Sequence, residues 1–289
     1  MDGWIILDKP SGVFSKTAAV RAAHLFNTKK NGHIGTLDPM ASGVLPVAIG
    51  NATKMVPFIE EFCERTKEYL FSVQFGFETD TLDITGTEVS RNNIIPTESA
   101  LRAILPKFTG DINQIPPKFS AVHINGRRAY ELARSGQEIE IPSRRVKVYS
   151  LELTGISGDS WNFCMRCAPG TYVRSIARDI AYSLGTLATV GMIRRTQSGI
   201  FSIKNAYTLD FLENLFNNGG DVGEYLAPVD FGLGDIPVLN LDDKSTKLYR
   251  NGGFVKVGNT DGLYRVYFDN KFVGIGTVSG GVLKPRRTI

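Results

Sequence analysis

Hydrophobic and polar residues alternate along two stretches of the chain. In YLFSVQFGF, residues 69–77, apolar side chains occupy every second position, and WNFCMRC, residues 161–167, repeats the alternation. A period of two is typical of a β-strand with one buried face, so we predict a half-buried strand in each stretch. The positions expected on the buried faces are Tyr69, Phe71, Val73, Phe75 and Phe77 in the first strand and Trp161, Phe163, Met165 and Cys167 in the second.

The period changes directly after the second strand. Residues 169–185, PGTYVRSIARDIAYSLG, place apolar side chains three or four positions apart, which predicts an amphipathic helix. Gly185 is typical of the residue that follows a helix C-terminus. Strands and helices that mix without a repeating βαβ period favour an α+β fold with a largely antiparallel sheet. The helical stripe consists of Val173, Ile176, Ala177, Ile180, Ala181 and Leu184.

A second, smaller domain is expected at the C-terminal end. Residues 209–235 are acidic and contain the turn-rich segment NNGGDVG, which indicates a boundary. The residues beyond it form short β-type runs separated by Gly, Asn and Asp, a spacing typical of a small all-β domain. We predict a large domain over residues 1–231 and a small β domain over residues 232–289.

The composition is that of a globular protein. The chain has 289 residues, of which 42% are hydrophobic and 21% are charged, and no apolar run approaches the length of a membrane span. The opening MDGWIILDKPSG lacks the basic start of a signal peptide, and three cysteines do not suggest a disulfide framework. We therefore expect a cytoplasmic protein.

The net charge of +4 is spread unevenly along the chain. Residues 118–147 carry seven basic and three acidic side chains, and residues 166–195 carry five basic and one acidic. Residues 209–243 instead carry eight acids and neither Lys nor Arg. Basic segments of this kind suit a polyanionic partner, although a merely solvated charged surface explains the charge equally well.

One carboxylate, Asp38, lies directly before Pro39 in the glycine-containing segment NGHIGTLDPMASGVLP. It could cap a short helix or turn, because Asp is favoured at the N-cap and Pro at the first helical position. It could instead act as a covalent nucleophile or as a base. A reactive carboxylate needs an opposite charge to orient it, and Arg174 is a candidate, although its position also suits an ordinary surface arginine. Tyr69 could likewise be a plain core aromatic.

Other kinds of site find little support in the sequence. The chain has three histidines, and the CxxC of Cys164 and Cys167 falls in a strand pattern, so a zinc, redox or Ser-His-Asp site is not expected. Neither a P-loop nor a strand–GxGxxG–helix motif is present. The acids of GFETDTLDITG lack the calcium-loop spacing and suit a polar turn. We expect neither a metal nor a cofactor.

Several segments taken together are more specific than any one of them. They occur in the order LDKPSG, GHIGTLDPMASGVLP, ATK, KEYLFSVQFGFETDTLDITG, QIPPKFSAVHINGRRAYELARSG, GTYVRSIARDI and IRRTQSGIF. Over residues 3–203, where these segments lie, the chain resembles the bacterial TruB-type tRNA pseudouridine synthases, which modify the T-loop uridine at conventional position 55. The β-rich tail resembles a PUA domain, a small RNA-binding barrel.

The resemblance implies a fold, a reaction and a partner. The fold is that of pseudouridine synthases, with a mixed, largely antiparallel central sheet flanked by helices, an insertion over about residues 113–145 that closes over the RNA, and a PUA-like domain. The reaction isomerises uridine to pseudouridine by base flipping and by cleavage and rejoining of the glycosidic linkage. It requires no cofactor, metal or protein partner, so we expect a monomer that binds the T stem-loop of tRNA.

The resemblance also implies roles for particular residues. Asp38 corresponds to the family's catalytic aspartate, and Arg174 corresponds to the arginine that pairs with it. Tyr69 corresponds to the tyrosine that stacks on the target base and is a proposed general base. His33 matches the histidine that helps to hold the flipped-out T-loop. The remaining positions expected near the substrate are Lys9, Lys54, Asp80 and Tyr172.

Two alternatives remain open. One is a guide-RNA-dependent synthase of the archaeal or nucleolar type, against which the long insertion and the compact C-terminus argue. The other is a non-catalytic RNA-binding or tRNA-folding protein on the same scaffold, against which the intact set Asp38, Tyr69 and Arg174 argues. Attack of Asp38 on the ribose C1′ and attack on the uracil C6 fit the sequence equally well.

Overall fold

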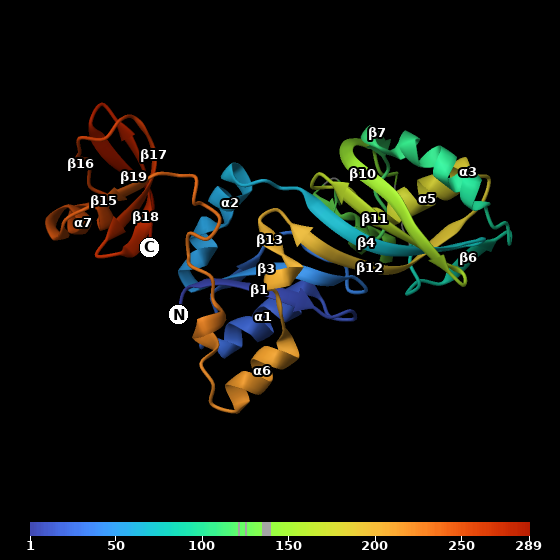
Figure 1. The fold of residues 1–289 in the computed structure, drawn as a ribbon, viewed down its shortest axis with the longest axis horizontal. Helices are drawn as coiled ribbons and strands as arrows, with labels where there is room; N and C mark the ends of the chain where they lie inside the picture. Colours follow the sequence, from blue (N-terminus) through green and yellow to red (C-terminus); the bar gives the residue numbers. More distant parts are fainter. Residues whose placement is uncertain (121, 125, 135–139) are drawn as a thin grey trace.

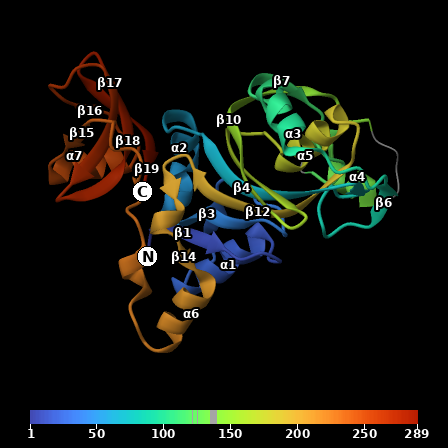
Figure 2. The ribbon, with the colours of Figure 1, turned by 45° about the vertical axis from the view of Figure 1, so that its right-hand side comes forward.

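The computed structural model describes residues 1–120, 122–124, 126–134 and 140–289. The chain forms a large body around one long mixed sheet, and a small β domain stands beside this body at the C-terminal end (Figure 1). Figure 2, turned by 45°, shows the same separation of the two parts. The predicted insertion includes residues 121, 125 and 135–139, which lie outside the described residues.

The large sheet contains ten described strands. Eight of them are neighbours in the spatial order β14 (Tyr207–Thr208), β1 (Gly3–Lys9), β3 (Ser42–Ile49), β12 (Ala188–Ser198), β4 (Lys67–Phe75), β11 (Ser160–Cys167), β10 (Arg144–Ser157) and β7 (Gly110–Gln114). The other two pair with strands of this series: β2 (Asn31–His33) with β3 and β13 (Phe201–Ser202) with β12. The parallel pairs are β14 with β1 and β3 with β12, and the other neighbouring pairs of this sheet are antiparallel. The mixed, largely antiparallel sheet is therefore confirmed.

Helices cover both faces of this sheet. On one side α1 (Ser15–Leu25) and α6 (Leu209–Asn217) pack together beside β1, and α5 (Val173–Ser183) packs against β12 and β4. On the other side lies α2 (Val56–Phe62). The remaining elements of the body are α3 (Glu98–Ile104), α4 (Ala129–Arg134), η1 (Gly50–Met55), η2 (Leu105–Phe108), η3 (Ile203–Asn205), η4 (Val222–Tyr225), β5 (Phe77–Thr79), β6 (Glu88–Arg91), β8 (His123–Ile124) and β9 (Arg127–Arg128). Among the helices of the described ranges, none combines the length and the apolar character that crossing a membrane requires.

Strand β1 shows why both faces are covered. Its sequence GWIILDK is almost continuously apolar, and Ile5 and Leu7 belong to one hydrophobic core while Trp4 and Ile6 belong to another. Successive side chains of a strand point to opposite faces, so a continuous apolar run needs apolar neighbours on both sides. The first core includes residues of α1, α5 and α6, and the second includes residues of α2.

Both alternating stretches form the predicted strands. They are the neighbours β4 and β11, and Phe71 stacks on Phe163 with ring centroids 5.1 Å apart. The helical stripe forms α5, and Gly185 follows it with a φ of +70°, a value that glycine adopts at no steric cost. Phe77 departs from the prediction, because β4 ends at Phe75 and Phe77 begins the separate strand β5.

The C-terminal domain is built on a five-stranded sheet, so the small β domain is confirmed. Its spatial order is β15 (Val238–Asn240), β17 (Gly262–Phe268), β18 (Lys271–Ser279), β19 (Val282–Thr288) and β16 (Val255–Lys256). One helix, α7 (Asp243–Arg250), accompanies the sheet. The sequence did not reveal this helix, because DKSTKLYR is strongly charged and buries Thr246 and Tyr249 alone. The predicted boundary between residues 231 and 232 stays a prediction.

The stacked pair in the centre of the large sheet provides a test of the core. Replacing Phe71 by Ala removes a buried ring and leaves a cavity, so we expect the free energy of unfolding to fall by about 3–5 kcal/mol. The matched control is Leu70→Ala on the opposite face of β4, where the side chain is 38% exposed and a loss below about 1 kcal/mol is expected. Urea denaturation measures both variants, and equal losses would contradict the assignment of the two faces.

Candidate active site

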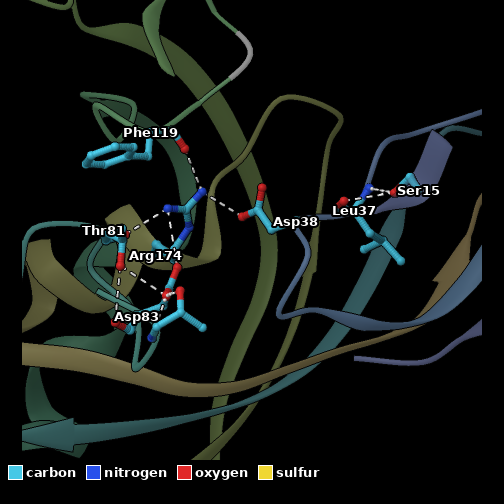
Figure 3. A network of polar contacts seen from close by, with 8 residues as sticks. Ser15, Leu37, Asp38, Thr81, Asp83, Phe119 and Arg174 are labelled. Atoms are coloured by element: carbon cyan, nitrogen blue, oxygen red, sulfur yellow. Dashed lines mark hydrogen bonds and ion pairs between the residues drawn. The ribbon is translucent and has the colours of Figure 1, made fainter. Parts of the chain in front are cut away.

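Asp38 lies on the loop that joins β2 to β3, and its carboxylate points toward Arg174 (Figure 3). The loop is held on both sides of this residue. The Ser15 hydroxyl donates to the Leu37 carbonyl at 2.8 Å and accepts from the Leu37 N–H at 2.9 Å. The Ala41 N–H donates to the Asp38 carbonyl at 3.1 Å. Asp38 therefore opens a short turn, as one interpretation of the sequence predicted, but no helix begins there and its carboxylate is directed at Arg174.

Arg174 is buried in the first turn of α5, with 3% of its side chain exposed. Its Nη2 lies 2.6 Å from Asp38 Oδ2 and donates to the Phe119 carbonyl at 2.9 Å. Its Nη1 donates to the Thr81 carbonyl at 2.7 Å and lies 3.5 Å from Asp83 Oδ2. Burying a guanidinium costs several kcal/mol unless other groups compensate it, and here two carboxylates and two carbonyls do so. The interpretation of Arg174 as an ordinary surface arginine is therefore wrong.

Asp83 is a residue of this site that the sequence analysis missed. The Thr81 hydroxyl and the Thr85 N–H each donate to its Oδ1 at 3.0 Å, and its Oδ2 is the atom nearest Arg174. Asp80, three residues earlier, is exposed, and its carboxylate instead accepts from the Thr87 N–H at 2.8 Å. The turn predicted for GFETDTLDITG is present, but nothing in one sequence distinguishes the two carboxylates.

A cavity of about 150 Å³ lies beside the Asp38–Arg174 pair. A cavity of this size accommodates a benzene-sized ring. The cavity is open to solvent on one side, and the Asp38 side chain is 36% exposed while that of Arg174 is 3% exposed. The polar side chains of the lining include Asp38, Lys67, Tyr69 and Arg174, and the apolar ones are Leu37, Ala41, Val173 and Ile193.

Tyr69 forms one wall of this cavity from β4 and is 7% exposed. The strand register places it directly opposite Arg195 of β12. Burial raises the pKa of the Tyr69 phenol, whereas the nearby Arg195 guanidinium lowers it. The phenol is therefore protonated at neutral pH. Tyr69 belongs to the hydrophobic core, as the sequence allowed, and it lines the cavity as well.

Lys9 is fully buried at the end of β1, where its ammonium supports the loop of Asp38. It donates to the carbonyls of Pro10 at 2.8 Å, Val13 at 2.7 Å and Pro39 at 3.3 Å. Burial lowers the pKa of Lys9 to about 8, while Asp38 raises it. The side chain thus fixes the position of the turn and does not line the cavity.

The other predicted residues lie in different places. Tyr172 lines the cavity at the N-cap of α5. His33 ends β2, where its Nε2 lies 3.1 Å from Thr36 Oγ1 and burial lowers the pKa of the imidazole. Lys54 lies outside the cavity lining, and its Nζ donates to the Thr288 carbonyl of the C-terminal domain at 2.9 Å. Within the described ranges, no three His, Cys, Asp or Glu side chains are grouped so that they could hold a metal ion.

The second carboxylate on Arg174 can be tested against its exposed neighbour. Asp83→Asn removes one charge from a buried ion pair, so we expect the free energy of unfolding to fall by about 3 kcal/mol. The matched control, Asp80→Asn in the same turn, loses one exposed charge, and a fall below about 1 kcal/mol is expected. Both are measured by urea denaturation at neutral pH. A neutral effect of Asp83→Asn would show that Asp38 alone compensates Arg174.

Three family models together match most of the chain. The TruB family pseudouridylate synthase N-terminal domain matches residues 23–173. The tRNA pseudouridylate synthase B C-terminal domain matches residues 174–233, and the C-terminal model of pseudouridine synthase II TruB matches residues 237–289. The resemblance inferred from the sequence is thereby confirmed.

Curated relatives and solved structures agree with these models. The tRNA pseudouridine synthase B of Ehrlichia chaffeensis is 42% identical over 99% of each chain, and that of Caulobacter sp. (strain K31) is 44% identical over 84% of this chain and 78% of the relative. The crystal structure of a Cbf5-Nop10-Gar1 complex matches with a TM-score of 0.67 and 25% identity, over 99% of this chain and 84% of that chain. The archaeal box H/ACA sRNP Nop10-Cbf5 complex matches with a TM-score of 0.66 and 25% identity, over 99% and 85%. The chain belongs to the TruB family of pseudouridylate synthases.

Proposed function

We propose that the protein isomerises uridine to pseudouridine in the T-loop of tRNA, at position 55. The observation that carries the proposal is the Asp38 carboxylate, held by Arg174 beside a ring-sized cavity that polar and apolar side chains line together. The curated relatives are named tRNA pseudouridine synthase B, which supports tRNA as the substrate. The basic segments of the chain support a polyanionic partner of this kind.

The reaction exchanges one bond of the uracil for another. The N1–C1′ bond breaks, the C5–C1′ bond forms, C5 loses a proton and N1 gains one, so the atoms balance without an oxidant, a reductant or water. Asp38 is the nucleophile and leaves again when the product forms. Attack on the ribose C1′ and attack on the uracil C6 both suit a base seated in the cavity. Arg174 aims the carboxylate at that base.

The target uracil can reach Asp38 only after it flips out of the base stack of the RNA loop. Base flipping costs a few kcal/mol, which stacking on an aromatic side chain and contacts to phosphates offset. Tyr69 offers a ring for such stacking, and Tyr172 lines the same cavity. We propose that His33 and Tyr172 help to hold the extruded loop. Lys9 keeps the turn of Asp38 in place. Lys54 and Asp80 lie outside the cavity lining, so we assign them no contact with the base.

Tyr69 has a second role in this proposal, in the last step of the reaction. Its phenol gives its proton to N1 and takes the C5 proton in return, so the side chain ends as it began. The intermediate phenolate lies opposite Arg195, whose positive charge lowers the cost of forming it.

The alternatives predict different behaviour on bare RNA. A guide-RNA-dependent synthase is inactive on a tRNA transcript without other components, and a tRNA-folding protein binds the transcript without changing it. The decisive experiment is to map pseudouridine in unmodified tRNA before and after incubation with the pure protein. We expect conversion at position 55 alone, and its absence would refute the proposal. We also propose that the protein acts in the cytoplasm as a monomer, which its mass in solution would test.

Substitution of the nucleophile separates binding from chemistry. Asp38→Asn keeps the size of the side chain but removes its nucleophilic charge, so we expect tRNA affinity within about threefold of the wild type and no detectable isomerisation. Filter binding and pseudouridine mapping measure the two quantities. Retained turnover in this variant would refute the role of Asp38.

Substitution of the tyrosine separates stacking from proton transfer. Tyr69→Phe keeps the ring but removes the hydroxyl, so we expect near-normal tRNA affinity and a single-turnover rate reduced by about 10²–10⁴-fold. Rapid-quench kinetics with labelled tRNA measures the rate. Full activity would leave Tyr69 as a stacking platform only.

A further inference from the structure

Lys67 lines the same cavity as Asp38 and Tyr69, yet the reaction described above gives it no role. It begins β4 two residues before Tyr69, and since side chains alternate along a strand, both point to the same face. Lys67 also lines a second cavity of about 140 Å³. The side chain therefore stands in the wall that the two cavities share.

The Glu60 carboxylate raises the pKa of the Lys67 ammonium, but it is a minor influence beside burial and does not form an ion pair with Lys67. In the part of the chain that the structure describes, no hydrogen bond or ion pair joins it to another residue. The register places Lys67 opposite Cys167 on β11 and opposite Ser198 on β12. Burial raises the pKa of the Cys167 thiol to about 11, so this neighbour carries no negative charge at neutral pH.

A second cation faces the same place. Arg195 is fully buried, and its Nε and Nη2 donate to the carbonyls of Val44 and Gly35, but no described residue offers an acceptor to its Nη1. A Cβ atom on Gly35 would lie 3.2 Å from Arg195 Nη1 and 3.3 Å from Lys67 Nζ. Two cationic nitrogens thus converge beside the loop that carries Asp38. This corner of the site favours a negatively charged ligand group.

Arg174 cannot supply the donor that such a group needs. Its two Nη atoms are occupied by the carboxylates of Asp38 and Asp83 and by two carbonyls. Its Nε has no acceptor among the described residues, but it is buried and does not face the open cavity. A lysine ammonium has three N–H donors. Lys67 lines the same cavity, is only partly buried, and uses none of its donors in a hydrogen bond to another described residue.

The protonation of Lys67 is compatible with this use. Burial lowers the pKa of Lys67 to about 8, and Arg195 acts in the same direction. The group is therefore mainly protonated at pH 7 and loses its proton as the pH rises through 8. The charged and titratable groups around it, within the described residues, are Tyr69 on β4, Cys167 on β11, Arg195 on β12, Tyr172 and Arg174 at the start of α5, Asp38 across the cavity, and Glu60, Glu64 and Arg65 before β4.

We propose that Lys67 is a further catalytic residue, which donates a hydrogen bond to a carbonyl oxygen of the target uracil and stabilises the negative charge that the ring acquires. This inference rests on the proposed isomerisation. When Asp38 bonds to C1′, the electron pair of the broken N1–C1′ bond stays on the uracil and is shared with its oxygens. When Asp38 bonds to C6 instead, the ring becomes an enolate with the charge on O4. Lys67 keeps its own proton on either route.

A backbone phosphate of the RNA is the other source of negative oxygen that could reach this ammonium. The cavity favours the base, because it is large enough for a flat ring and the Tyr69 ring and the apolar side chains of Leu37, Ala41, Val173 and Ile193 line it. The two sources differ in their consequences. A phosphate contact exists already in the bound complex and contributes to affinity and to its salt dependence, whereas charge on the ring develops only during the reaction and affects the rate.

The test compares Lys67→Met, Lys67→Arg and the exposed control Lys107→Met in single-turnover kinetics and tRNA binding. We expect Lys67→Met to reduce the rate about 100-fold, with an affinity within about twofold of the wild type. The control removes the same charge far from the cavity and keeps the wild-type rate. We expect the single-turnover rate of the wild type to fall above about pH 8 as Lys67 loses its proton. In Lys67→Arg the decrease in rate is expected at higher pH, because a guanidinium stays protonated.

Each of the other outcomes overturns the inference. If Lys67→Met reacts at the wild-type rate, Lys67 has no catalytic role. If the variant binds tRNA more weakly and the slope of log affinity against log salt concentration is smaller by about 1, Lys67 contacts a phosphate instead. A fall near pH 8 that persists in Lys67→Arg belongs to another group, such as Lys9. If Lys67→Met does not fold, the pH profile of Lys67→Arg still decides. Absence of pseudouridine with the wild-type protein refutes the proposed function itself and is distinguishable from all of these.

Discussion

The guanidinium of Arg174 is the group on which the site depends. It joins the loop of Asp38, the turn of Asp83 and the carbonyl of Phe119 to the first turn of α5. These segments lie far apart in the sequence, and one buried cation gathers them because each supplies oxygen that the charge requires. The same contacts hold the Asp38 carboxylate at the edge of the cavity before any substrate arrives, so little reorganisation remains for the reaction.

The sheet supplies the rest of the arrangement. Because β4 lies between β12 and β11, one face of the sheet brings Lys67 and Tyr69 next to Arg195. Apolar packing, such as the stacked pair Phe71 and Phe163 in the same strands, fixes the register. A slip by one residue would turn every one of these side chains to the other face. Core packing therefore positions the chemistry, although the core residues take no part in it.

The site contains more buried positive charge than negative. Lys9 and Arg195 are satisfied mainly by backbone carbonyls, which costs less than leaving them unpaired but does not neutralise them. This excess of buried positive charge suits a reaction in which a neutral uracil becomes an anion, because the positive charge that stabilises the anion is already in place. It also suits RNA, which brings negative charge to the surface around the cavity.

Local periodicity and the order of motifs were enough to predict much of the protein. The alternation in β4 and β11, the stripe of α5 and the β-rich tail follow from side-chain spacing, because burial of one face acts on each element separately. The segment order identified the family and, through it, Asp38, Tyr69 and Arg174. Only the tertiary structure separated Asp83 from Asp80, placed Lys9 and Lys54 outside the cavity lining, and left Lys67 without a hydrogen bond or ion pair to another described residue. These outcomes depend on tertiary contacts between strands and loops that are distant in sequence. Local sequence patterns contain no information about such contacts.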